Sequence, residues 1–207
     1  MRIGILGSGA MGSALGTVWA QAGHHVFFSY SRDFGKLEDL AKRIGQQAQA
    51  ATVTDAVAQS EALLIAIPWH RLDDLLKQAG SLQDKILLTC MLPMTEDDSD
   101  LALGFTTSGA EELGRRTEAR VVGTFNTVWS NVIATRPAHS NSKGSMFYIG
   151  DDSEAKQIAE QLIRDAGFDP IDAGLLANAR LLEPFGLLMG RMGFAYDPLV
   201  AYRFVKP

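Results

Sequence analysis

The sequence predicts an α/β protein of the Rossmann type, with a doubly wound, mostly parallel sheet and a small C-terminal extension. The chain opens with an apolar strand that runs straight into a Gly-x-Gly-x-x-Gly turn and an amphipathic helix. Strand and helix patterns then alternate, and residues 62–67 are wholly apolar, as in strands buried on both faces of a parallel sheet. A length of 207 residues suits a single domain over residues 1–207, in which 169–207 add a strand and a helix.

The elements are predicted in chain order from local patterns. Strands are expected at residues 1–6, 25–28, 48–53, 62–67, 85–89, 120–125, 146–149 and 169–171. Helices are expected at residues 11–22, 34–44, 71–80, 108–116, 153–166 and 175–192, with a short helix capped by Thr54 and Asp55. Gly23 should end the first helix, and Ser108 with Glu111 has the spacing of a capping box. Residues 93–103, with four acids, are expected to be the loosest segment.

Composition excludes several classes of partner. The chain has 24 acidic and 19 basic residues and no basic cluster, so nucleic acid is not an expected partner. The longest apolar run, residues 62–69, is strand-sized, which predicts a soluble, cytoplasmic protein with no membrane partner. The single cysteine, Cys90, excludes internal disulfides, and the four histidines show no ligand spacing, so no metal site is expected.

The glycine-rich turn indicates a dinucleotide site. Gly7 permits the tight turn, Gly9 lets the backbone approach a pyrophosphate, and Gly12 lets the helix lie close to the strand. The helix N-terminus then presents free N–H groups to the anion. The alternative is a turn that binds no nucleotide, which the agreement of strand, motif and helix disfavours. The expected cofactor-binding residues of the turn are Gly7, Ser8, Gly9, Ala10, Met11 and Gly12.

The residues after the second predicted strand favour NADP over NAD. An NAD site usually has an acid there for the ribose 2′-hydroxyl, whereas this chain has Ser31 and Arg32, which can bind a 2′-phosphate. Lys36, in the first turn of the next helix, is a second candidate phosphate ligand. Asp33 is expected to cap that helix, and the alternatives are that it pairs with Arg32 or points at the ribose. The alternative is that Arg32 is a solvated surface residue.

Ligands of open α/β sheets bind beyond the carboxyl ends of the strands, so the segments after the fourth, fifth and sixth strands should complete the site. Their candidate cofactor-binding residues are Ile67, Pro68, Trp69 and Met91, and their candidate catalytic residues are Asn126, Thr127 and His70. Hydride transfer needs orientation and exclusion of water more than an acid or a base. Asn126 is therefore expected to orient the two reacting rings, with His70 as a less favoured general acid. Cys90 is expected to be a small buried residue, because no basic partner lies near it in sequence.

Several blocks of sequence, in order along nearly the whole chain, carry a family resemblance. They are Gly7 to Gly12, Ser31-Arg32, Ile67-Pro68-Trp69, residues 104–111, residues 121–127 and a tail pattern from 150 to 183. With these blocks the chain resembles the coenzyme F420-dependent NADP reductases and the related cytosolic oxidoreductase domain of STEAP-type ferric reductases. The resemblance implies NADPH bound along the glycine turn and Ser31-Arg32. It also implies a flavin or deazaflavin stacked on the nicotinamide, between the strand ends and the C-terminal segment.

Two departures from the family pattern fall in the expected acceptor pocket. Deazaflavin-using members commonly have His-Thr where this chain has Asn126-Thr127, and many bacterial relatives have Asn-Pro where it has Met91-Leu92-Pro93. The expected acceptor, which is FMN, FAD or coenzyme F420, therefore stays open. No haem-bearing membrane segment is expected to follow.

Three functions remain in competition. The first is hydride transfer between NADPH and a flavin-like acceptor. The second is reduction of an imine or oxo acid, although the stretch after Asp169 is short for the helical domain that such enzymes use. The third is an NADP-sensing module without turnover. An apolar terminal helix that includes Leu181, Leu187 and Leu188 also favours a homodimer.

Overall fold

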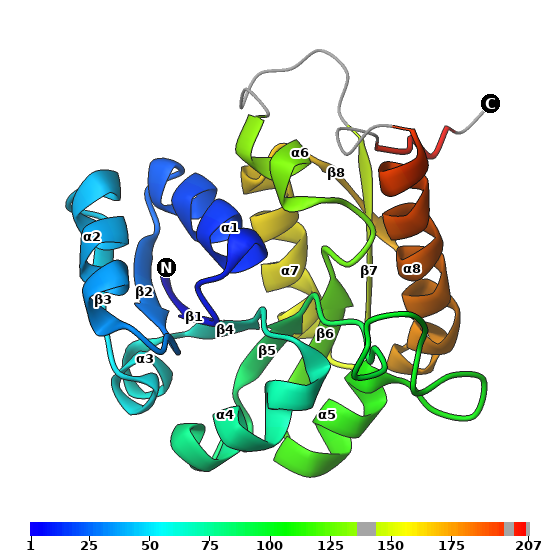
Figure 1. Cartoon of the computed structure of the whole chain (residues 1–207), viewed down its shortest axis with the longest axis horizontal. Helices are drawn as coiled ribbons and strands as arrows, with labels where there is room; N and C mark the ends of the chain where they lie inside the picture. Colours follow the sequence, from blue (N-terminus) through cyan, green and yellow to red (C-terminus); the bar gives the residue numbers. More distant parts are fainter. Residues whose placement is uncertain (136–143, 197–200, 206–207) are drawn as a thin grey trace.

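The computed structural model of the chain describes residues 1–135, 144–196 and 201–205. These residues form an eight-stranded sheet in the order β3-β2-β1-β4-β5-β6-β7-β8 (Figure 1). The strands are β1 (Arg2–Leu6), β2 (His25–Ser29), β3 (Ala48–Ala50), β4 (Ala62–Ile65), β5 (Ile86–Thr89), β6 (Arg120–Thr124), β7 (Ser145–Gly150) and β8 (Asp169–Asp172). All neighbouring pairs are parallel except β6 and β7. The predicted Rossmann-type fold class is confirmed.

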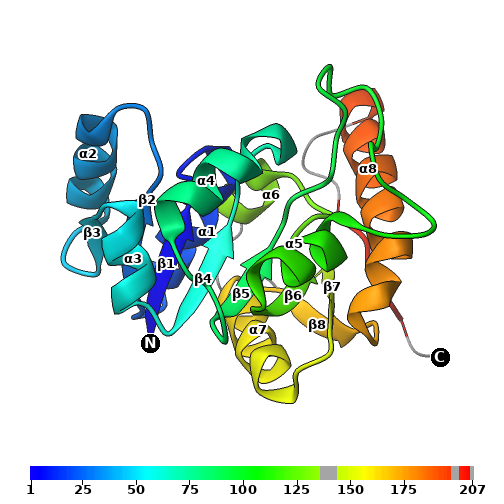
Figure 2. The same cartoon turned by 90° about the horizontal axis from the view of Figure 1, so that it is seen from below.

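Helices cover both faces of this sheet, as Figures 1 and 2 show. The helices are α1 (Ala10–Gln21), α2 (Phe34–Ile44), α3 (Val53–Gln59), α4 (Leu72–Ala79), α5 (Gly109–Thr117), α6 (Ser130–Thr135), α7 (Ser153–Asp165) and α8 (Ala179–Ala195). Short 3-10 turns, η1 (Trp69–Arg71) and η2 (Leu176–Asn178), precede α4 and α8. One apolar layer joins the sheet to α1, α2, α6 and α7, and the other joins it to α3, α4, α5 and α8.

Trp19 of α1 anchors the first layer. Its ring is fully buried, and its indole N–H donates a hydrogen bond of 2.9 Å to the carbonyl of Leu162 in α7. The ring also packs edge to face against Phe125, which follows β6. Because α1 is fixed in this way at its C-terminal end, the glycine turn at its other end is held against the strand tips.

The strand and helix boundaries show where the sequence predictions were inaccurate. The third strand ends at Ala50, because Thr52 caps α3: its hydroxyl accepts a hydrogen bond from the N–H of Asp55. The predicted cap at Thr54 is therefore wrong. The fourth strand ends at Ile65, two residues before the predicted end. Gly23, with φ +93°, follows α1 as predicted, and Ser108 caps α5 as predicted.

The C-terminal extension completes the edge of the sheet beyond β7. β8 pairs in parallel with β7, and α8 packs against α5 (Figure 2). Tyr202 lies beside these elements, where its carbonyl accepts a hydrogen bond from the N–H of Ser145. Within the described ranges no helix has the length and apolar character needed to cross a bilayer.

Candidate functional site

Each glycine of the turn is explained by a different feature of the structure. A Cβ atom at Gly7, whose φ is +116°, would lie 2.5 Å from the carbonyl oxygen of Ala66, and one at Gly12 would lie 1.9 Å from the carbonyl oxygen of Gly7. A Cβ atom at Gly9 would meet nothing within 4 Å. Packing therefore requires Gly7 and Gly12, whereas Gly9 faces open space. Gly9 is also the N-cap of α1 and caps it with no side chain, so N–H groups of the first turn remain available to a ligand.

A first cavity of about 400 Å³ opens beside this turn, at the carboxyl ends of β1, β2 and β4. β1 lies between β2 and β4, so this is the point at which the strand order reverses, where open α/β sheets bind ligands. The residues that line the first cavity are Gly7, Ser8, Gly9, Tyr30, Ser31, Arg32, Ala66, Ile67, Pro68, His70, Arg71, Asp74 and Gln78.

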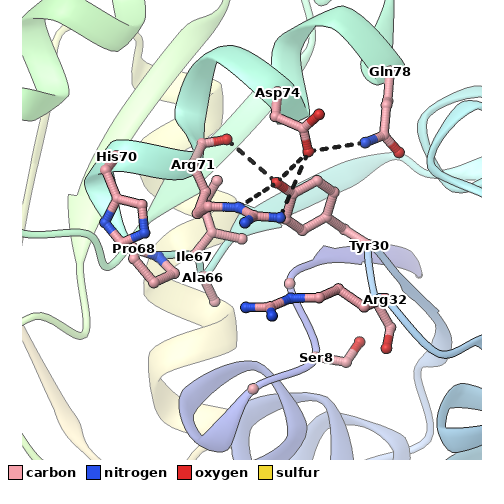
Figure 3. A pocket seen from close by; sticks show the side chains of 13 residues that line it. Ser8, Tyr30, Arg32, Ala66, Ile67, Pro68, His70, Arg71, Asp74 and Gln78 are labelled. Atoms are coloured by element: carbon pink, nitrogen blue, oxygen red, sulfur yellow. Dashed lines mark hydrogen bonds and ion pairs between the residues drawn. The ribbon is translucent and has the colours of Figure 1, made fainter.

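Arg32 projects into the first cavity from the β2 side (Figure 3). It is exposed, and it makes no ion pair or side-chain hydrogen bond with the residues that the structure describes. Ser31 is also on the lining, and its hydroxyl closes a local turn with the backbone of Asp33. Lys36 is exposed on α2 and does not line this cavity. Asp33 is the N-cap of α2 in position, but its side chain makes no capping hydrogen bond.

The opposite wall of the first cavity comes from η1 and α4, and of its residues the sequence predicted only His70. Tyr30 has a left-handed backbone with φ 58°, and its hydroxyl donates a hydrogen bond of 2.7 Å to the carboxylate of Asp74. Arg71 donates from Nε to the same hydroxyl at 3.4 Å, and Gln78 donates to Asp74 at 3.1 Å (Figure 3). The helical spacing of 71, 74 and 78 was the available signal that these side chains share a face.

A second cavity of about 610 Å³ lies on the other side of the glycine turn, at the ends of β5 and β6. Its wall is largely apolar, and α8 forms its outer side. The residues that line it are Ala10, Met11, Cys90, Leu92, Met94, Asp98, Phe125, Asn126, Val128, Trp129, Ser130, Gly186, Leu187, Gly190, Arg191 and Phe194. Residues 7–9 thus line one cavity and residues 10–11 the other, so the turn separates two adjacent spaces.

Glycines of α8 set the width of the second cavity. A Cβ atom at Gly186 would lie 2.5 Å from the carbonyl oxygen of Asn126, and one at Gly193 would lie 2.0 Å from Nε1 of Trp129. These two contacts hold the helix close to the loop after β6. A Cβ atom at Gly190, between them, would meet nothing within 4 Å, so the cavity opens there.

Asn126 lines the second cavity and has a hydrogen-bond acceptor that the described residues leave free. The preceding residue, Phe125, is fully buried and has a left-handed backbone with φ 59°. Non-glycine residues with a left-handed backbone are strained, and they are often found at functional sites. The Asn126 Oδ1 atom is buried and accepts no hydrogen bond from the described residues. Its amide therefore has an acceptor available to a ligand.

The other predicted site residues are dispersed. His70 lines the first cavity and not the second, so it does not share a space with Asn126. Thr127 is buried, and its hydroxyl bonds to that of Tyr202 at 3.0 Å, so it lines neither cavity. Met91 is buried in the core and Trp69 is half-buried against it, so both line neither cavity. The three candidate catalytic residues are therefore not brought together.

Cys90 lines the second cavity as a neutral thiol. Burial raises its pKa to about 12, so the thiolate is not populated at neutral pH. Its Sγ lies 3.6 Å from the carbonyl oxygen of Ile65, to which it donates. The raised pKa agrees with the prediction that Cys90 is not a nucleophile, but the predicted burial is only partial, because Cys90 borders the cavity. Across the part of the chain that the structure describes, no group of three or more potential metal ligands is found.

The acidic loop at residues 94–101 borders the second cavity and is more ordered than the sequence suggested. Met94 and Leu101 form an antiparallel bridge, and the carboxylate of Asp97 accepts hydrogen bonds from Thr95 and Ser99. These hydroxyl groups lower the pKa of Asp97 to about 2. Arg191 of α8 donates to the carbonyl of Ser99 at 2.8 Å, which ties the loop to the helix.

Residues 2–93, which include the glycine turn, Arg32 and the β4 end, match a family of NADP oxidoreductases. The family is described as NADP oxidoreductase, coenzyme F420-dependent. The resemblance inferred from the sequence is confirmed. A curated relative, the metalloreductase STEAP3 of Rattus norvegicus, is 29% identical over 187 residues, which cover 90% of this chain and 36% of that protein. The chain thus spans about a third of the length of this relative.

Solved structures confirm the fold. A candidate F420-dependent NADP reductase from Arthrobacter sp. FB24 superposes with a TM-score of 0.88 at 24% identity, covering 100% of both chains. A hypothetical protein from Sinorhizobium meliloti, SMa0349, gives a TM-score of 0.81 at 25% identity, covering 100% of this chain and 96% of that one. A reductive aminase from Aspergillus terreus, solved with NADPH and ethyl-5-oxohexanoate, gives 0.68 at 21% identity, covering 94% of this chain and 62% of that one.

Proposed function

We propose that this chain is an NADP(H)-dependent oxidoreductase that transfers hydride between NADPH and a flavin or deazaflavin acceptor, such as FMN, FAD or coenzyme F420. The observation that carries the proposal is the pair of adjacent cavities on either side of the glycine turn. One is polar and cationic and the other apolar, which suits the adenosine and nicotinamide ends of a dinucleotide. Bound NADPH supplies the hydride.

The residues of the first cavity have complementary roles in this proposal. The open space at Gly9 admits the pyrophosphate to the N-terminus of α1, and Ser8 borders the same space. Arg32 binds the ribose 2′-phosphate, because its guanidinium has no partner among the described residues. Ile67 and Pro68 form an apolar wall for the adenosine. The match of residues 2–93 to an NADP oxidoreductase family supports this assignment.

The second cavity takes the nicotinamide and the acceptor. Met11, Cys90 and Val128 supply apolar contacts that exclude water. Asn126 orients the rings through its unpartnered amide oxygen, and no residue is required as a proton donor. Thr127 acts indirectly, by fixing the loop after β6 to Tyr202.

A second candidate is reduction of an imine or an oxo acid. The reductive aminase with a similar fold supports this alternative, although this chain spans only 62% of it. A third is a module that binds NADP(H) without turnover. An acceptor panel separates all three: we expect NADPH oxidation with riboflavin, FMN, FAD or F420. Oxidation only with cyclic imines or oxo acids would favour the second function, and binding without oxidation the third.

Filling the second cavity with a larger side chain tests whether the acceptor binds there. Gly190→Leu places a side chain in open space on a helix, so the fold should persist. We expect turnover with the best acceptor to fall sharply while 2′,5′-ADP still binds the first cavity. Normal turnover in this variant would remove the acceptor from the second cavity.

Nucleotide choice is tested with Arg32→Ala, with Lys36→Ala as control because Lys36 lies outside the first cavity. We expect Arg32→Ala to weaken NADPH binding by about 1.5–3 kcal/mol, the value of a hydrogen bond to a charged group, and to leave NADH nearly unchanged. The control should change neither. Calorimetric titration with both nucleotides measures this, and equal losses for NADPH and NADH in Arg32→Ala would contradict the assignment.

We also propose that the outer face of α8 forms a homodimer. Leu181, Leu188 and Met192 are 71%, 53% and 39% exposed and follow one another on a single stripe of the helix. Light scattering on the purified chain should give twice the monomer mass, and Leu188→Glu should give the monomer. A monomeric wild-type chain would refute this part of the proposal.

A further inference from the structure

Arg71 is fixed at the first cavity by a cluster that the turn motif does not explain. Its Nε donates to the hydroxyl of Tyr30 at 3.4 Å, and its Nη2 lies 4.0 Å from the carboxylate of Asp74. Asp74 in turn accepts from Tyr30 and Gln78. These three contacts all meet Oδ2 of the carboxylate, while the remaining N–H groups of Arg71 donate no hydrogen bond to an acceptor in the described ranges.

Tyr30 is held in an unfavourable backbone conformation by the same cluster. A left-handed φ of 58° in a bulky residue costs about 1–3 kcal/mol and persists only where contacts impose it. Burial raises the pKa of the Tyr30 phenol, so it remains a hydroxyl that can donate to Asp74. The end of β2, which carries Ser31 and Arg32, is thereby tied to η1 and α4 across the cavity.

Charge decides what this arrangement can bind. The side chains that line the first cavity and are charged at neutral pH are Arg32, Arg71 and Asp74. Without Arg71 the cavity lining would be electrically neutral, and with it the lining is cationic. Figure 3 shows the guanidinium groups of Arg32 and Arg71 reaching into the gap from opposite walls.

We propose that Arg71 is a second cationic ligand of the ribose 2′-phosphate, opposite Arg32, and that Asp74 and Tyr30 are its positioning residues. The inference rests on the proposed use of NADP(H) and adds a specificity residue from the far wall. Two planar forks on opposite sides can hold one phosphate through several charge-assisted hydrogen bonds.

The test measures binding alone, so it does not depend on the acceptor. Calorimetric titrations with 2′,5′-ADP and 5′-AMP as probes isolate the contribution of the 2′-phosphate. Arg71→Met keeps the apolar stem and should weaken 2′,5′-ADP binding by about ten- to a hundredfold, with at most a small change for 5′-AMP. Arg71→Lys should recover much of that loss. Arg115→Met, an exposed arginine on α5 outside the cavity, is the matched control and should change neither.

The role of Tyr30 in positioning Arg71 is tested by a separate variant. Tyr30→Phe removes the hydroxyl that bridges Arg71 and Asp74, so it should weaken 2′,5′-ADP several-fold, leave 5′-AMP unchanged and keep the melting temperature close to the wild-type value. The dependence of 2′,5′-ADP affinity on salt should also become less steep in Arg71→Met, because one cation fewer meets the phosphate.

Three other outcomes would overturn either the role of Arg71 or the NADP(H) assignment. Equal losses for both probes in Arg71→Met would mean that Arg71 contacts the adenosine or the 5′-phosphate, which the two probes share, and would overturn the proposal. An unchanged preference for 2′,5′-ADP would overturn it as well, while leaving the proposed function intact. A wild-type chain with no preference for 2′,5′-ADP would instead refute the NADP(H) assignment itself.

Discussion

At the scale of single residues, the glycines of the turn serve two purposes: Gly12 is needed for packing, and Gly9 leaves space for a ligand. Gly12 lies where α1 packs closely on β1, because a Cβ atom there would meet the carbonyl oxygen of Gly7 and the side chain of Ile5. Gly9 has φ −71° and ψ −164°, an extended conformation that any residue can adopt, and it faces open space. The turn therefore offers two substitutions with opposite expected effects.

Gly9→Val should leave the fold intact and abolish binding of both NADPH and NADH, because the branched side chain occupies the space for the pyrophosphate. Gly12→Ala should lower the melting temperature markedly, because its Cβ would lie 1.9 Å from a carbonyl oxygen. Circular dichroism melting and nucleotide titration on both variants check this. A folded Gly9→Val chain that binds NADPH normally would place the phosphate elsewhere.

Asn126 and His70 lie in different cavities, so their substitutions should separate chemistry from binding. Asn126→Ala should slow turnover more than it weakens NADPH affinity, and it should barely affect stability, because its Oδ1 accepts no hydrogen bond from the described residues. His70→Ala should keep substantial activity. The readouts are kcat, NADPH affinity and melting temperature. Complete inactivity of His70→Ala would indicate acid-base chemistry and a different class of acceptor.

The residues of the turn, Arg32 and the strand ends could be predicted because each follows from a local pattern. The wall formed by Arg71 and Asp74 could not, since helical spacing shows which side chains share a face but not what that face meets. That contact depends on the left-handed backbone of Tyr30, which no local pattern specifies. Thr127 was placed at the rim by its position after β6, but its hydroxyl turns to Tyr202, which is distant in sequence.

At the scale of elements, α8 and the loop at residues 94–101 enclose the second cavity. The loop was expected to be loose because it is rich in acidic residues. One of these residues, Asp97, instead orders the loop by accepting hydrogen bonds from Thr95 and Ser99. Asp98 lines the cavity, and Arg191, the cation that faces this loop from α8, lies 3.8 Å from Asp100. Two carboxylates and one cation thus stand at the mouth of the cavity, a net negative charge that lowers the affinity for the phosphate of FMN, FAD or F420 without excluding these acceptors.

This acidity predicts that riboflavin is a better acceptor than FMN, which has the same ring and an added phosphate. Asp98→Asn should raise kcat/KM for FMN by about two- to fivefold at low salt, leave riboflavin unchanged and have no effect at high salt, as for exposed charges. Asparagine suits the left-handed backbone of Asp98, with φ 55°. Asp84→Asn is the matched control, because Asp84 is also exposed and left-handed, with φ 61°, but precedes β5. A preference for FMN over riboflavin would refute the acidic-mouth argument.

The buried carboxyl group of Glu183 couples α8 to α5. It accepts hydrogen bonds of 2.9 Å from the N–H groups of Gly109 and Ala110, at the N-terminus of α5, and burial raises its pKa to about 7. The folded state thus retains a proton that the unfolded chain loses near pH 4.5. The stability from this group is present below about pH 4.5 and is lost as the pH rises to 7.

We therefore expect the free energy of unfolding to fall by up to about 3 kcal/mol between pH 5 and 8, and Glu183→Gln to flatten this decline. Urea unfolding at several pH values measures it. Glu112→Gln is the control, since its arginine partner lowers the pKa of Glu112 and confines its effect to more acidic solutions. A Glu183→Gln profile as steep as the wild-type one would contradict the role of this carboxyl group.

At the scale of the whole molecule, the order of strands creates the site. β1 lies centrally, with β2 and β4 on either side, so the glycine turn emerges between two sets of strand ends and separates the two cavities. The alternation of strand and helix patterns was enough to predict this architecture. The outer wall of the second cavity could not be predicted in the same way, because α8 reaches it from the far end of the chain through close contacts at Gly186 and Gly193.

We propose that NADPH binds along the glycine turn and presents one face of its nicotinamide to an acceptor in the second cavity. The most direct measurement is the fate of deuterium in NADPH labelled at the 4R or the 4S position, oxidised by the chain with its best acceptor. We expect the recovered NADP⁺ to have lost the label from one epimer and kept it from the other, because a fixed cavity admits the acceptor to a single face. Partial label from both epimers, or no oxidation of NADPH by any acceptor, would contradict it.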